Sequence, residues 1–256
     1  MTETTPTVLS SASRPLKRLV RFLFFPRHEF AQLAEQERLS WVAPMLTLSL
    51  TLLLTVLVSG LLRARAAAMG EMPLPPGWEW WTPEMQKNYK QAMQAMQSPV
   101  FLYVIPAVVN LAGLWLGWSI LSGFLHLAST LLGGRSHMAS ALVIVAWASL
   151  PLALRDLLRV GYMLSVGHTI TSPGLSGFVT STSGGALFLA GLLEQVDIFL
   201  IWRAVLLVFG FQRLDGLSTG KAITATLVVL ALALTAQAGL GALLTSLSGM
   251  IINQPF

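Results

Sequence analysis

The sequence predicts an all-α integral membrane protein, a bundle of five transmembrane helices with one amphipathic helix at each side of the membrane. Three observations predict this fold class. Hydrophobic residues make up 54% of the 256-residue chain and charged residues only 11%. The mean hydropathy is +0.69. Several apolar runs also reach the ~20 residues that a helix needs to cross a bilayer, whereas a soluble domain is about 25% charged.

The chain before the first apolar run divides into a tail and a basic segment. Residues 1–13 are polar and rich in Ser and Thr, which predicts a disordered tail. Because no short apolar stretch lies close to the initiating Met, we expect no cleaved signal peptide. Residues 14–38 mix Lys and Arg with Leu, Val and Phe, and Pro26 suits the first turn of a helix. We favour an amphipathic helix on the inner leaflet, with a docking surface for a cytoplasmic partner as the alternative.

Residues 39–252 form the predicted membrane domain. The runs that we expect to cross the bilayer are residues 41–62, 100–132, 138–166, 186–211 and 222–250. Pro106 and Pro151 fall within two of these runs. A proline inside a helix removes a backbone hydrogen-bond donor, so we expect a kink at each.

Loop charges predict the orientation. Lys and Arg gather before the first run, at Arg135 after the second, and at Arg213 and Lys221 after the fourth. These segments share one side of a five-helix arrangement, and the positive-inside rule makes that side cytoplasmic. We therefore expect a multi-pass protein of the cytoplasmic (inner) membrane with its N terminus inside and its C terminus outside. The basic excess reports on topology and lipid contact, and we expect no nucleic-acid partner.

Residues 63–98 form the predicted outer loop. Trp78, Trp80 and Trp81 are expected anchors at the headgroup level, where an indole can keep its N–H hydrated and bury its ring. Thr82 is placed to cap a helix that starts at Pro83. One face of that helix carries Met85, Tyr89, Ala92, Met93 and Met96. We expect this face to lie on the membrane or to cap the bundle rather than to bind a soft metal, because no His or Cys lies near it.

Charged residues also lie within the third and fourth predicted spans. Arg155 and Arg159 share a face of the third span, and Glu194 and Asp197 share a face of the fourth. A charge at the centre of a membrane helix costs about 2.5–3.5 kcal/mol, so we predict that these four residues form an intramembrane ion-pair cluster. The cluster is either a clamp that fixes helix register or a site for a proton, an ion or a lipid headgroup. Arg203 lies about 120° from Asp197 around the helix and is expected to reach the inner headgroups as an interfacial anchor.

No motif in the sequence predicts catalysis, a cofactor or a metal. The chain has no Cys, which removes thiolate nucleophiles and Cys-ligated metals. Fingerprints for phosphate loops and dinucleotides are absent. Ser176 lies in a G-x-S-G stretch that resembles the nucleophile motif of rhomboid proteases, but no His follows His168 to act as a base. His126 and His137 are too few for a metal site. We predict that the protein is not an enzyme, with an intramembrane enzyme as the weakest alternative.

Three stretches together resemble the bacterial branch of the Yip family, membrane proteins named for their interaction with Ypt and Rab GTPases. They are FLFFPRHEFAQLAEQERLSWVAPML, WASLPLALRDLLR and QVDIFLIWRAVLLVFGFQRLDGLSTGKA. The family pattern falls on Pro26, Phe30, Pro151, Arg155, Asp197, Trp202, Gly210, Ser218, Lys221 and Ala222. The long outer loop, with its WEWW run, departs from the compact loops of the family.

The resemblance implies a five-helix bundle with a cytoplasmic N terminus and no enzyme activity. It implies a membrane adaptor or organiser that binds other membrane proteins or the lipid bilayer, and some bacterial relatives resemble accessory partners of exporters. GTPase binding is not carried over, because bacteria lack Rab-driven vesicle traffic. A small transporter or channel component that uses the charged faces of the third and fourth spans is the alternative function.

Overall fold

The computed structural model describes residues 18–36, 40–70, 74, 77–135, 137–179 and 184–252. Across these ranges the regular structure is helical throughout, which confirms the predicted all-α membrane fold. The chain forms two compact units. Unit 1 comprises Met1–Leu48, Gly117–Leu152 and Ser172–Phe256, and unit 2 comprises Ser49–Leu116 and Ala153–Thr171.

Four helices of the described chain are long and apolar enough to cross a membrane. They cover Val42–Ala68, Val100–Leu131, Met138–Val166 and Thr219–Ser246. The first is α3 (Val42–Ala68), and the second is α5 (Ile105–Leu131) with the π-helical turn η2 (Val100–Val104) before it. The third joins α6 (Met138–Ala148) to α7 (Leu150–Val166), and the fourth belongs to α10 (Thr219–Ile252). These helices confirm four of the predicted spans.

The predicted fourth span is not a continuous helix. The chain there forms α8 (Gly184–Gln195) and α9 (Ile198–Leu214), of 12 and 17 residues, and each is shorter than the ~20 residues of a typical span. The break occurs because Asp197 has an extended backbone and its side chain caps α9. The prediction that Glu194 and Asp197 share one helix face was therefore wrong, and the count of five spans stays a prediction.

Exposed apolar side chains recur at helical spacing on the long helices. On α3 they form a ridge of Leu46, Leu50, Leu54, Leu57 and Leu61. Similar exposed residues lie along α5 and α10. In water a surface of this kind would be unfavourable by about 25 cal/mol per Å², whereas lipid chains solvate it. The exposed ridges therefore agree with a multi-pass membrane protein.

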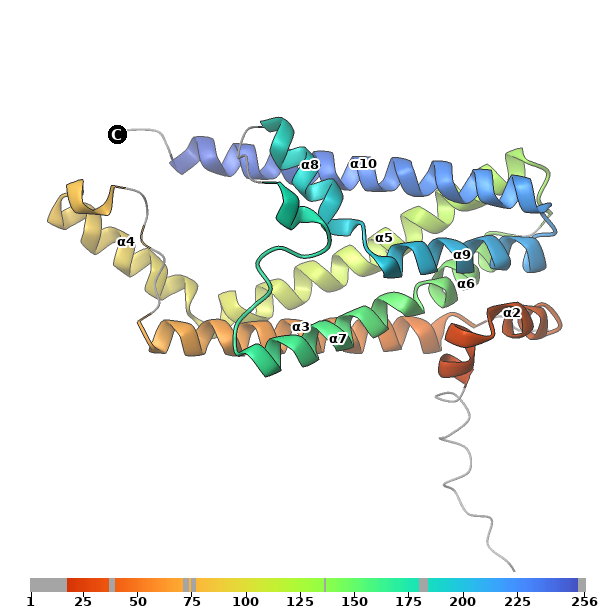
Figure 1. Cartoon of the computed structure of the whole chain (residues 1–256), viewed down its shortest axis with the longest axis horizontal. Coiled ribbons are helices and arrows are strands. Elements are labelled where there is room, and N and C mark those ends of the chain that lie inside the picture. Colours follow the sequence, from red (N-terminus) through yellow and green to blue (C-terminus); the bar gives the residue numbers. More distant parts are fainter. Residues whose placement is uncertain are drawn as a thin grey trace, which may run out of the picture. The chain divides into compact units, whose positions relative to one another are not determined.

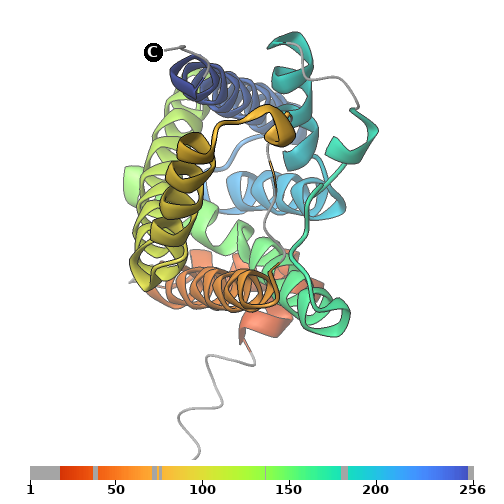
Figure 2. The same ribbon diagram turned by 90° about the vertical axis from the view of Figure 1, so that its left-hand side faces the viewer.

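Unit 1 has its core around α6. Every residue from Val143 to Ala148 is buried, and α6 packs against α9. Helix α9 also contacts α10 and the N-terminal helix α2 (Pro26–Ala34), while α8 packs against α10 at an angle (Figure 1, Figure 2). The indole N–H of Trp118 donates a hydrogen bond to the backbone oxygen of Leu142 at 2.9 Å. This bond joins α5 to α6 within the unit.

Both prolines that predicted kinks lie at helix irregularities. Pro151 follows a turn at Ser149 that separates α6 from α7, and Pro106 follows the π-helical turn η2. Proline has no N–H to donate to the preceding turn, so the regular helical pattern is interrupted before each of them.

Unit 2 contains the rest of α3 and α7 and the helix α4 (Pro83–Met96). Val58 and Leu62 of α3 pack with Val160 and Met163 of α7. Helix α3 continues to Ala68, past the predicted span end at residue 62, through Arg and Ala residues that favour helix, and the outer loop at residues 63–98 stays a prediction. The short 3-10 helix η1 (Trp78–Trp80) precedes α4.

Candidate functional site

The N-terminal segment docks on α6 and α9 in unit 1. Residues 18–24 are helical, and α2 begins at Pro26 as predicted. Phe22 and Phe30 are fully buried, with their ring centroids 4.6 Å apart. The Phe22 ring also stacks on the Trp147 ring of α6 at 4.6 Å. The apolar side of this segment therefore packs inside the protein.

Gly210 lets α2, α6 and α9 meet. A Cβ atom at Gly210 would collide with the side chain of Ile144 and would lie 3.1 Å from the Phe30 ring. No larger residue fits unless the Ile144 side chain or the Phe30 ring moves. Phe30 and Gly210 are both positions of the family pattern, and the structure brings them together as a packing contact.

A buried carboxylate holds the same segment. Glu29 is only 1% exposed, and its Oε1 lies 3.1 Å from Nε of Arg21. Its Oε2 lies 3.8 Å from Nε of Arg18, whose guanidinium lies 5.4 Å from the centre of the Trp147 ring. A buried charge is tolerated only when it is paired, so the two arginines keep Glu29 compatible with its position.

The opposite side of the segment is exposed. Phe24 and Phe25 are 65% and 64% exposed, and the Phe24 ring centroid lies 6.3 Å from that of Trp202. The Arg27 guanidinium lies 4.7 Å from the Phe209 ring of α9, which is cation–π distance. We call this surface the basic–aromatic face, and it comprises Val20, Arg21, Phe24, Phe25 and Arg27.

A polar clamp ties two turns together at the ends of α5 and α9. The Ser129 hydroxyl donates a hydrogen bond to the Asp215 carboxylate, and both residues are buried. The Lys221 ammonium donates to the backbone oxygen of Leu132 at 2.6 Å. Lys221 is a family-pattern residue, whereas the sequence analysis missed Ser129 and Asp215. The Asp-Gly pair at 215–216 is a turn signal that could have identified one of them.

Asp197 acts as the N-cap of α9. Its carboxylate accepts a hydrogen bond from the backbone N–H of Leu200 at 2.8 Å, which satisfies one of the unpaired donors at a helix start. The nearby end of α8 is covered by the loop around η3 (Ser176–Phe178). The backbone N–H of Leu175 donates to the oxygen of Leu193 at 2.9 Å. Glu194 itself is exposed on unit 1.

The remaining members of the predicted ion-pair cluster lie on α7. Arg155 pairs with its neighbour in the sequence, with its Nε 3.5 Å from Oδ1 of Asp156. Arg159 lies one helical turn further along α7, in unit 2. Arg203 is half-buried on α9. The cluster of these arginines with Glu194 and Asp197 stays a prediction.

The three predicted tryptophan anchors differ in their surroundings. Trp78 and Trp81 lie 5.5 Å apart between ring centroids, and Tyr89 of α4 lies 5.5 Å from Trp78 and 5.7 Å from Trp81. Trp80 is 87% exposed. Anchoring stays a prediction for all three, but Trp80 alone among them has an uncovered ring.

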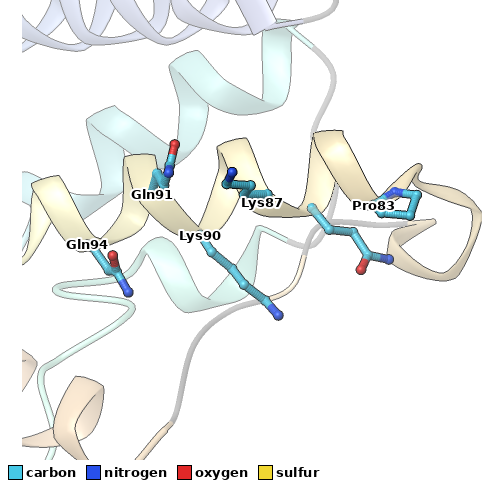
Figure 3. A pocket seen from close by; sticks show the side chains of 6 residues that line it. Pro83, Lys87, Lys90, Gln91 and Gln94 are labelled. Carbon is cyan, nitrogen blue, oxygen red and sulfur yellow. The ribbon is translucent and has the colours of Figure 1, made fainter.

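The residues that could form a metal or catalytic centre can be located in the described parts of the structure. Among the described residues no group of at least three His, Asp or Glu could hold a metal ion. The Ser176 hydroxyl donates a hydrogen bond to the oxygen of Pro173 at 2.7 Å, inside its own turn. An open hollow follows the polar side of α4 (Figure 3), and its lining residues are Pro83, Gln86, Lys87, Lys90, Gln91 and Gln94.

Comparison with known protein families finds a match over most of the chain. The family model described as the Yip1 domain matches residues 20–240, a range that includes the docked N-terminal segment, the polar clamp and the break before α9. No curated protein and no solved structure matches the chain.

Proposed function

Because the chain belongs to the Yip1 domain family, we propose that it is a non-catalytic organiser in the membrane that binds other membrane proteins. The family consists of non-enzymatic membrane proteins. We further propose that the partner docks on the basic–aromatic face of the N-terminal segment.

The observation that carries this proposal is the use of the family-pattern residues. Pro26 begins α2, and Phe30 packs against Gly210. Asp197 caps α9, and Lys221 binds a backbone oxygen of the neighbouring turn. Each of these residues builds or joins helices, and none supplies a reactive group to a cleft. A pattern of this kind specifies a scaffold, and the scaffold presents the exposed face of residues 20–27.

The composition of the basic–aromatic face suits a protein partner close to the bilayer. Burial of one large apolar side chain contributes about 1.5–3 kcal/mol, and Phe24 and Phe25 are both largely exposed. Arg21 and Arg27 flank them, and arginine is enriched among the residues that dominate interface energies. The complementary surface is an apolar segment with carboxylates beside it. One form of such a partner is a component of an exporter.

The proposed location is the inner membrane with the basic–aromatic face in the cytoplasm. The positive-inside rule supports this orientation, because Arg135 follows α5, Arg213 lies in the last turn of α9 and Lys221 lies at the start of α10, all beside the polar clamp. The C terminus of α10 then lies on the outer side.

Crosslinking in native membranes tests the proposal. A photo-crosslinking amino acid at position 25 of the full chain should capture a defined set of membrane proteins. The double variant Phe24→Ser and Phe25→Ser should lose those proteins in co-purification. Phe178→Ser is the matched control, because Phe178 is 80% exposed in a distant loop and its loss should leave the set unchanged. An identical set for all variants, or crosslinks to lipid alone, would contradict docking on this face.

A second function, a small transporter or channel component, is favoured by the break at Asp197. Transporters place substrate sites at interrupted membrane helices, and Glu194 is exposed beside the break. The test is ion or proton flux into proteoliposomes that contain the purified chain. Flux that Glu194→Gln abolishes in a stably folded protein would favour this function over the organiser.

A further inference from the structure

We infer that the segment from η1 through α4 is a membrane-surface element that lies on the lipid headgroups and inserts one apolar stripe into them. The stripe comprises Met85, Ala92 and Met96 of α4, and the exposed Trp80 of η1 lies just before that helix in the sequence. This inference goes beyond the proposed function. The ligand is lipid rather than a membrane protein, and the segment belongs to unit 2 rather than to the N-terminal segment of unit 1.

The segment keeps its shape through its own contacts. The rings of Trp78, Trp81 and Tyr89 form a cluster with centroid distances of 5.5–5.7 Å. The Gln86 side-chain amide donates to the backbone oxygens of both tryptophans, at 3.1 and 3.4 Å. Thr82 caps α4 by accepting from the N–H of Met85 at 3.3 Å. The turn is therefore folded onto the helix without support from a larger core.

The cluster leaves a separate apolar stripe uncovered. Met85, Ala92 and Met96 are spaced at i, i+7 and i+11 and so share a helix face. Met85 is 49% exposed, Met96 57% and Trp80 87%. No residue of α4 is buried. The exposed thioethers of Met85 and Met96 are unfavourable in water, and so is the exposed Trp80 indole, but all three side chains suit the boundary between headgroups and acyl chains.

The connection to α5 limits what can cover this stripe. Only residues 97–99 separate Met96 from η2, where the long apolar run of Val100–Leu131 starts. A link of that length reaches at most roughly 14 Å even when fully extended. The C-terminal end of α4 therefore stays close to the level at which a spanning helix enters the bilayer, as its position beside the start of α5 illustrates (Figure 1).

The polar side of α4 lies across the helix from the stripe. The hollow in Figure 3 is lined by Lys87 and Lys90 together with Pro83 and glutamines, and by the 3.6-residue period both lysines lie on the opposite side of the helix from Met85. A helix with an apolar stripe on one side and Lys and Gln on the other is the pattern of an interfacial helix, with its polar side in water. This pattern favours lipid over a second copy of the chain as the surface that covers the stripe.

Spin labelling of the full chain can test the inference directly, because the sequence contains no Cys. Single variants Ala92→Cys and Met96→Cys place a label on the stripe, and Gln91→Cys and Gln94→Cys place matched labels on the polar side. The labelled protein is reconstituted into bilayers of phosphatidylcholine with phosphatidylglycerol. Collision rates with oxygen, which concentrates in lipid, and with a water-soluble nickel chelate are then compared.

The stripe labels should show an oxygen-to-nickel collision ratio several-fold higher than the polar-side labels. Equal access of nickel at all four positions would overturn the inference, because the stripe would then lie in water. Exclusion of both reagents from the stripe labels would also overturn it, because the stripe would then be covered by protein. Neither result would affect docking on residues 20–27, so failure here is distinct from failure of the proposed function.

Discussion

Gly210 of α9 and Phe30 of α2 pack so closely that a Cβ atom on the glycine would lie 3.1 Å from the phenylalanine ring. The same Cβ atom would collide with Ile144 of α6. This contact joins three helices that lie far apart in the sequence. In this chain the contact accounts for a glycine at position 210 opposite an aromatic ring at position 30.

Gly210→Ala should destabilise the protein even though alanine is the better helix former. Overpacking of a filled contact costs about 1–3 kcal/mol, which exceeds the ~1 kcal/mol that alanine gains in an exposed helix. Thermal unfolding of the purified chain in detergent measures the difference. Gly239→Ala on α10 is the control, because no atom lies within 4 Å of a Cβ built there, and it should be neutral or stabilising. Equal stability of both variants would show that the contact has room to spare.

Glu29→Gln should loosen the N-terminal segment. The substitution removes the negative charge that attracts both Arg18 and Arg21, so the ion pairs that hold the segment are lost. Trypsin should then cleave after Arg21 and Arg27 several-fold faster than in the unmodified protein. Glu35→Gln, which changes an exposed carboxylate at the end of the same helix, should leave the cleavage rate unchanged. Similar rates for the two variants would mean that Glu29 does not hold the segment.

Ser129 and Asp215 should be energetically coupled. A double-mutant cycle with Ser129→Ala and Asp215→Ala, each of which removes the hydrogen bond, should give an interaction energy of about 1–3 kcal/mol. Ser122→Ala serves as the control, because the Ser122 hydroxyl is equally buried but bonds to the Trp118 oxygen in its own helix. Its effect should add to that of Asp215→Ala. Additivity for Ser129 as well would argue that the clamp contributes no stability.

Two substitutions of Asp197 separate the capping of α9 from the effect of the negative charge. Asp197→Ala should lower stability by about 0.5–2 kcal/mol, whereas Asp197→Asn keeps a capping oxygen and should have little effect. If the predicted ion-pair cluster exists, the Asn variant should be as unstable as the Ala variant. Addition of Arg155→Gln should then restore its stability. Yield and thermal unfolding of the purified variants distinguish the two results.

Local features of the fold could be predicted from the sequence. Pro26 and Thr82 each mark a helix start, because the signal lies within one turn of the structure that it produces. The long apolar runs around α3, α5 and α10 were equally clear, since length and composition alone decide whether a helix can span a bilayer.

Other features depend on partners that the sequence does not place side by side. The sequence pattern indicates that Asp197 is a charge inside one continuous membrane helix. In the structure its carboxylate accepts a hydrogen bond from a backbone N–H three residues away, and the continuous helix is interrupted there by the start of α9. Ser129 and Asp215 are 86 residues apart, so nothing in either local sequence indicates the bond. Trp78 and Trp81 looked equivalent to Trp80 until their contacts with Tyr89 were known.

Because α2 packs on α9, the N-terminal segment can reach its final position only after α9 has been synthesised. Phe22, Phe30 and Leu33 leave the ribosome about 180 residues before Gly210, which at ~5–20 residues per second is a wait of roughly 10–40 s. Until α6 and then α9 have been synthesised, these side chains lack the helix surfaces that bury them in the folded protein. The nascent N-terminal segment must therefore be shielded by the bilayer or by the insertion machinery, and its final docking is a late event in biogenesis.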